Sequence, residues 1–156
     1  MKVLIFYASY GGGHLSAAKA MKEVIQKKYP SYEIEVIDCM EYLNKPINFI
    51  TVKLYEEFAK KMPKMWGWVY RKSRKGLIAG FSNSVNRMLT NKLGKLIEKI
   101  NPNIIISAHP FSTQMCGILK KKGKLKIDVM TIMTDFKYHE QWLVRTSVFR
   151  KVLCVK

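Results

Sequence analysis

The sequence predicts an α/β fold in which a parallel β-sheet is covered by helices on both faces. Short, largely apolar or alternating runs are typical of strands, and they lie at residues 2–7, 33–37, 103–107, 127–133 and 151–155. Apolar residues recur at helical spacing between these runs, at residues 15–28, 48–62, 83–100 and 111–121. Because strands and helices alternate along the chain, we expect a Rossmann-like domain.

Charge is the unusual feature of the composition. The chain has 156 residues, which suits one domain with one hydrophobic core. It carries 28 Lys and Arg against 11 Asp and Glu, a formal net charge of +17. Such an excess attracts polyanions, and it leaves nucleic acid, anionic lipid headgroups and phosphorylated small molecules as partners.

Cysteine usage and hydropathy indicate the compartment. Cys39, Cys116 and Cys154 are far apart and form no CxxC pair, so we interpret them as reduced, buried side chains rather than disulfides or zinc ligands. No signal peptide opens the sequence, and no stretch approaches the ~18 apolar residues that a membrane span needs. We expect a cytoplasmic protein whose membrane association, if any, is peripheral.

A glycine-rich turn at residues 8–13 follows the first strand and precedes a helix. Glycines at this position let a ligand approach the helix N-terminus, where N–H groups and the helix dipole favour an anion. A purely structural tight turn is the alternative. Gly11-x-Gly13-x-x-Ser16, with Asp38 ending the second strand, also approximates the dinucleotide-binding fingerprint, but Ser replaces its third glycine.

His14 directly follows the three glycines, at the head of the predicted helix. The positive end of the helix dipole disfavours imidazolium, so we expect this side chain to stay neutral near pH 7 and to accept a proton. A general base that activates a hydroxyl needs this property. The alternative is a histidine that only caps the helix or fills the loop.

Three segments in order resemble one family: YASYGGGHLSAAKAM, NPNIIISAHPFST and MTIMTDFKYHEQWL. They are similar to the monogalactosyldiacylglycerol synthase and processive diacylglycerol glucosyltransferase family. The resemblance implies a GT-B fold with two Rossmann-like domains, of which the first binds the lipid acceptor and the membrane. The second holds the UDP-sugar, and the hexose is transferred to diacylglycerol with inversion. We expect no tightly bound cofactor and no metal ion.

The resemblance also implies roles for individual residues. His14 is the candidate base, and Asp135 and His139 are catalytic candidates that either replace it or orient it. Asp135 capping a turn and His139 bonding to backbone is the alternative. The substrate-binding candidates are Gly11, Gly12, Gly13, Ser16, His109, Pro110, Thr134 and Trp142.

The chain is about half the length that the family implies. We therefore expect residues 1–156 to be the N-terminal acceptor and membrane-binding domain, with the donor domain absent. Without a positioned donor, this domain alone is expected to be inactive in sugar transfer.

A basic, aromatic segment lies between residues 53 and 75. Trp and Tyr favour the headgroup–acyl boundary, and basic residues favour anionic lipid, so we expect docking on the inner face of the cell membrane. The alternative is that the aromatic residues belong to the core. A second cluster, Lys120–Lys122 with Lys124 and Lys126, extends the basic character. The membrane-binding candidates are Lys60, Lys61, Lys64, Trp66, Trp68, Arg71, Lys72, Arg74 and Lys75.

Other functions compete with this interpretation. A peptidoglycan lipid-linked N-acetylglucosaminyltransferase shares the fold and the glycine–histidine loop, although the Asp135–His139–Trp142 spacing favours diacylglycerol as acceptor. A basic nucleic-acid-binding module would exploit the charge, but no recognised motif supports it, and we expect no specific nucleic acid. An NAD- or FAD-binding domain is the third possibility.

Overall fold

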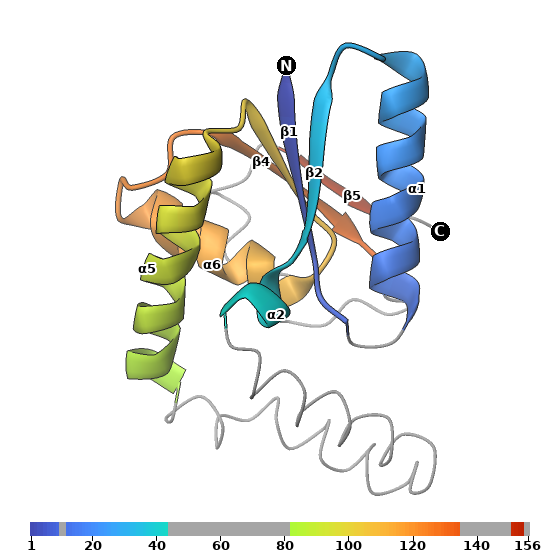
Figure 1. The fold of residues 1–156 in the computed structure, drawn as a ribbon. Helices are drawn as coiled ribbons and strands as arrows, with labels where there is room; N and C mark the ends of the chain where they lie inside the picture. The colour runs from blue at the N-terminus through green and yellow to red at the C-terminus, as the bar shows by residue number, and fades with distance from the viewer. Residues whose placement is uncertain (10–11, 44–81, 135–150, 155–156) are drawn as a thin grey trace, which may run out of the picture.

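The computed structural model describes residues 1–9, 12–43, 82–134 and 151–154 (Figure 1). Five strands form one parallel sheet in the order β2-β1-β3-β4-β5. The strands are β1 (Lys2–Tyr7), β2 (Glu33–Asp38), β3 (Ile104–Ser107), β4 (Asp128–Met133) and β5 (Lys151–Cys154). The expected parallel, Rossmann-like sheet is confirmed.

Helices cover both faces of this sheet (Figure 1). The described helices are α1 (Gly12–Lys28), α2 (Cys39–Leu43), α5 (Ser82–Ile100) and α6 (Pro110–Lys121). Helix α1 lies on one face, and α2, α5 and α6 lie on the other. None of the helices in the described ranges is long and apolar enough to cross a bilayer.

The core is divided by the pleat of the central strands. Successive side chains of a strand point to opposite faces, so Val3 and Ile5 of β1 pack in the cluster that contains Ala18 of α1. Leu4 and Phe6 belong instead to the larger cluster beneath the other three helices. Strand β1 therefore supplies apolar side chains to the core on both faces of the sheet.

Helix α5 packs closely on α6 at a glycine. A Cβ atom on Gly94 would lie 3.2 Å from Cδ2 of Leu119, which is tighter than an ordinary van der Waals contact. Leu93 and Leu96 flank this position and are buried. The absence of a side chain at Gly94 thus allows the buried face of α5 to approach α6.

Most predicted boundaries agree with the structure to within two residues. The exceptions are the start of α1 and an additional short helix. The expected turn at 8–13 is shorter, because α1 already includes Gly12 and Gly13. Helix α2 was not predicted, since five residues are too few to show helical periodicity. The predicted helix at 48–62 and the basic segment after it lie outside the described residues.

The strand order creates a switch point between β1 and β3. From β1 the chain crosses through α1 to β2 on one side, whereas β3 pairs with β1 on the other side. Phe6 aligns with Ser107 in the β1–β3 register. Ligands of open α/β sheets bind at such a point, outside the carboxyl ends of the strands. The segments that follow β1 and β3 therefore meet where a ligand site is expected.

Replacing Leu93 by Ala is expected to lower the free energy of unfolding by about 2–5 kcal/mol, because this fully buried side chain leaves a cavity between α5 and the sheet. Urea unfolding followed by circular dichroism measures the loss. Lys95→Ala, at an exposed position of the same helix, is the matched control and should change stability by less than about 0.5 kcal/mol. Equal effects of the two substitutions would contradict the described packing.

Candidate functional site

His14 lies in the first turn of α1, where β1 has just ended, and its side chain is half-buried. Its Nδ1 atom is 2.8 Å from the carbonyl oxygen of Ala108, the residue that follows β3. The same Nδ1 atom is 2.6 Å from Oγ1 of Thr134, the residue that follows β4. The segments that follow three neighbouring strands, β1, β3 and β4, thus meet at one imidazole.

These contacts determine which ring nitrogen of His14 carries the proton. A backbone carbonyl only accepts hydrogen bonds, so Nδ1 must donate to Ala108. In the neutral ring the lone pair is then on Nε2. The Thr134 hydroxyl lies close enough to share the Nδ1 proton as a second acceptor. The arrangement thus favours the Nδ1–H tautomer of a neutral His14 ring.

His109 is the second imidazole at this edge. It is the N-cap of α6: its Nδ1 accepts a hydrogen bond of 3.2 Å from the backbone N–H of Phe111. Pro110 follows at the first helical position, where a missing N–H costs nothing. The rings of His109 and His14 are edge to face, with centroids 4.6 Å apart. Burial, and to a lesser extent the neighbouring His14, lower the pKa of His109 to about 3.

A cluster of hydroxyl groups lies beneath the turn between β3 and α6. Ser107 Oγ is 2.6 Å from Ser112 Oγ and 2.8 Å from Thr113 Oγ1. All three hydroxyl oxygens lie 3.0–3.1 Å from the carbonyl oxygen of His109. These side chains, and that of Thr131 on β4, are fully buried. Sequence reasoning missed this hydroxyl cluster, although the segment SAHPFST contained the signal.

Asp38, the proposed ribose-binding acid of the dinucleotide alternative, has a structural role. One carboxylate oxygen accepts hydrogen bonds from the backbone N–H groups of Met40 (2.9 Å) and Glu41 (3.1 Å), which caps α2. The other accepts from the hydroxyl of Ser9. The carboxylate is buried and committed to these partners, so it does not support a cofactor-binding interpretation.

The structure places some of the other candidates near His14 and does not describe the rest. Gly12 and Gly13 form the exposed start of α1. Ser16 is also exposed and lies two residues after His14 on the same helix. Pro110 is buried at the start of α6, directly after His109. Gly11, Asp135, His139, Trp142 and the membrane-binding candidates at 60–75 lie outside the described residues.

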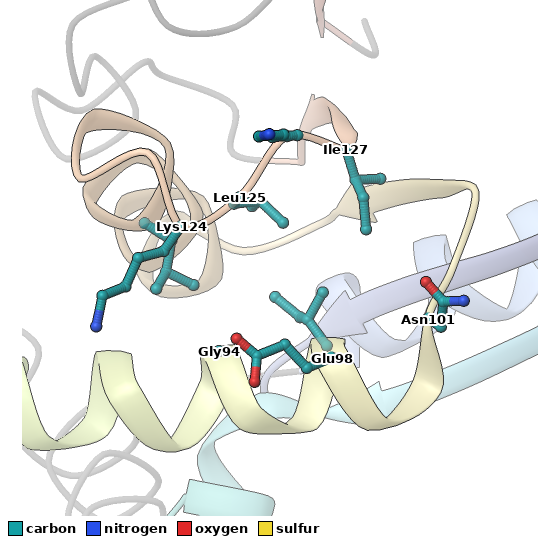
Figure 2. Close-up of a pocket in the computed structure, with 9 residues that line it drawn as sticks. Gly94, Glu98, Asn101, Lys124, Leu125 and Ile127 are labelled. Carbon is teal, nitrogen blue, oxygen red and sulfur yellow. The ribbon is translucent and has the colours of Figure 1, made fainter.

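A pocket between α5 and the loop before β4 lies away from these histidines (Figure 2). Buried Ile97, Leu119 and Leu125 form its floor, and Glu98 and Lys124 line its rim. It opens at the amino ends of β3 and β4, so it is separate from the carboxyl-end site. Within the described ranges, no three His, Cys, Asp or Glu side chains gather closely enough to hold a metal ion.

The parallel sheet with helices on both faces and a switch point between β1 and β3 defines an α/β domain of the class whose ligands bind at the carboxyl ends of the strands. The sequence model of the monogalactosyldiacylglycerol (MGDG) synthase family matches residues 14–149. The chain therefore belongs to this family, as the three sequence segments predicted. Its parallel sheet is consistent with the Rossmann-like N-terminal domain of a GT-B protein.

Known relatives agree with this assignment. Proteins named processive diacylglycerol beta-glucosyltransferase from Bacillus thuringiensis, Bacillus cereus and Bacillus anthracis are each 28% identical to the chain over 147 residues. The match covers 92% of this chain and 36% of each relative. The chain thus spans about a third of the length of the curated relatives it matches.

The low pKa of His109 predicts a pH-dependent stability. Below about pH 6.5 the unfolded histidine takes up a proton that the folded one refuses until about pH 3. Stability attributable to this group therefore falls by about 1.4 kcal/mol per pH unit across that window. Between pH 6.5 and 5.0 the loss is about 1.6 kcal/mol, because the unfolded histidine is already half protonated at pH 6.5.

His109→Asn is the matched control, because Asn caps a helix N-terminus well but does not titrate in this range. Urea unfolding at the two pH values should show a smaller loss in this variant than in the unmodified protein. Identical losses would mean that His109 titrates normally in the folded protein.

Proposed function

We propose that this domain forms the acceptor-binding half of an enzyme that transfers a hexose from a UDP-sugar to diacylglycerol with inversion, making glycolipid at the membrane surface. The observation that carries the proposal is His14, held by Ala108 and Thr134 at the switch point of the sheet. Family membership supports the choice of reaction, since the relatives are named for glucosyl transfer to diacylglycerol.

In this mechanism His14 is the base. Nε2 of His14 takes the proton from the free hydroxyl of diacylglycerol while the hydroxyl oxygen forms a bond to the anomeric carbon of the sugar. The bond from that carbon to UDP breaks on the opposite face, and its electron pair leaves with UDP. A neutral imidazole within hydrogen-bonding reach of the hydroxyl meets the requirement for general base catalysis. Asp135 and His139 remain the alternatives for the base or its orienting group.

Substrate contacts are proposed around this base. The exposed start of α1, with Gly12 and Gly13, gives a ligand close access to backbone N–H groups near His14. Gly11, which precedes this helix in the sequence, is proposed to contact the same ligand. Ser16, His109 with Pro110, and Trp142 complete the proposed acceptor wall. Because Thr134 contacts His14, we assign it the role of orienting the base rather than that of binding substrate.

The membrane-binding segment at 60–75 is proposed to dock beside this site. Before this segment the described residues end at Leu43, where α2 has just followed β2, and after it they begin again at Ser82, where α5 begins. Both points are at the carboxyl edge of the sheet, because α5 runs from there back to the start of β3 (Figure 1). This placement supports peripheral docking on anionic lipid of the inner membrane face, on the same edge as His14.

The donor is proposed to be held mostly by a second domain, with this one supplying the base and the acceptor. Efficient transfer requires both substrates in one geometry. Activity is therefore expected from the complete enzyme rather than from residues 1–156 alone.

His14→Gln in the complete enzyme is expected to lower kcat for transfer by about 10²–10⁴-fold, because the general base is lost. Radiolabelled UDP-glucose and UDP-galactose, assayed with diacylglycerol vesicles, measure the rate. Lys22→Ala, an exposed change on the same helix, is the control and should retain normal turnover. Near-normal turnover of His14→Gln would remove this residue from the base role, and Asp135→Asn and His139→Gln would then identify the base.

The double substitution Trp66→Ala with Trp68→Ala is expected to weaken binding to vesicles rich in phosphatidylglycerol, because the interfacial aromatic anchors are lost. Binding of the unmodified protein should itself weaken as salt rises, since basic side chains contact the lipid surface. Flotation of the protein with vesicles measures both effects. Tyr29→Ala removes an exposed aromatic residue at the far end of α1 and serves as the control. Tight binding to an RNA oligomer with no vesicle binding would overturn the membrane proposal.

A further inference from the structure

The hydroxyl cluster of Ser107, Ser112 and Thr113 contacts the carbonyl that directly follows the one bonded to His14. The carbonyl of Ala108 bonds His14, and the next carbonyl along the chain, that of His109, receives the cluster. The two carbonyls belong to consecutive peptide units. Only the φ and ψ angles of His109 lie between them, so holding the second unit restricts the orientations open to the first.

The turn is held from both sides. On the strand side, the N–H of Ala108 donates to the carbonyl of Phe6 on β1 (2.8 Å). On the helix side, the carbonyl of His109 accepts from the N–H of Thr113 (3.2 Å), and three hydroxyl oxygens lie 3.0–3.1 Å from it, so their protons are shared between this carbonyl and one another. A helix N-cap carbonyl ordinarily needs only the bond from the N–H four residues later. The three hydroxyls therefore exceed what capping of α6 requires.

Burying these hydroxyl groups also costs free energy of folding unless each has a hydrogen-bond partner. Ser107, Ser112 and Thr113 are fully buried, and a buried hydroxyl without a partner destabilises the fold. Alanine or valine would fill the same space without that requirement. The cost is offset because the hydroxyls bond one another and the His109 carbonyl, which makes the network rigid.

We propose that this hydroxyl cluster, together with Thr134, is a positioning element that keeps the proton of His14 on Nδ1. The cluster fixes the peptide units of the β3–α6 turn so that the Ala108 carbonyl stays on His14, and the Thr134 hydroxyl reinforces the same tautomer. The lone pair is thereby kept on Nε2, the nitrogen that serves as base. The inference rests on the proposed function for its catalytic meaning, but the tautomer can be measured without substrate.

The tautomer of His14 in the ¹⁵N-labelled chain is measured by long-range ¹H–¹⁵N correlation spectra at a pH where the ring is neutral. The unmodified protein should show Nδ1–H at His14. Thr113→Val, which keeps the shape but removes the hydroxyl, should shift the tautomer ratio toward Nε2–H by about fivefold, the effect of roughly one net hydrogen bond. Thr134→Val should act in the same direction.

Conservative variants separate positioning from simple destabilisation. Thr113→Ser and Thr134→Ser retain the hydroxyl and should restore the Nδ1–H form. Thr90→Val removes an equally buried hydroxyl from α5 and should lower stability without changing the tautomer. An unchanged tautomer in both Thr113→Val and Thr134→Val would overturn the proposal.

The outcomes also distinguish this proposal from the proposed function. A tautomer that responds as expected, with normal transfer by His14→Gln, would retain the positioning element and reject His14 as base. An unresponsive tautomer, with transfer abolished by His14→Gln, would reject the positioning element and retain the base.

Discussion

The hydrogen bond between His14 and the Ala108 carbonyl is the contact on which the site depends. It joins two residues that are 94 positions apart in the chain. It forms because β1 and β3 are parallel neighbours in a register that aligns Phe6 with Ser107. Parallel strands end at the same edge, so the residues after each strand meet there. A sheet with β1 and β3 separated would leave His14 without this carbonyl.

The two imidazoles at this edge have opposite tautomers, and each is set by backbone. His14 donates from Nδ1 to a carbonyl, whereas His109 accepts at Nδ1 from an N–H and so holds its proton on Nε2. Burial keeps the pKa of His109 at about 3, so this ring stays neutral near pH 7. In the proposed mechanism only His14 would gain a charge, which would avoid two adjacent cations.

Sequence reasoning anticipated the parts of the structure that local pattern determines. The strand runs, the helices predicted at 15–28, 83–100 and 111–121, and the placement of His14 at the head of a helix were predicted correctly. The start of α1 at Gly12 was missed because glycine has poor helix propensity and suggests a turn. The contact of Thr134 with His14 was missed for another reason: it depends on strand register, which a single sequence does not specify over long separations. The hydroxyl cluster is local to residues 107–113 and was missed although the segment SAHPFST contains its three hydroxyl residues.

The edge of the sheet at which a basic segment lies determines whether that segment could dock the proposed site on a membrane. Lys120, Lys121, Lys122 and Lys124 lie at the end of α6 and in the loop before β4, at the amino edge. The six residues of β4 separate that loop from Thr134 by roughly 20 Å. The hydroxyl of diacylglycerol lies at the membrane surface, so docking through these lysines would hold His14 too far from it. The proposed docking from the carboxyl edge, where the described residues end at Leu43 and begin again at Ser82, would instead bring the proposed base and the acceptor together.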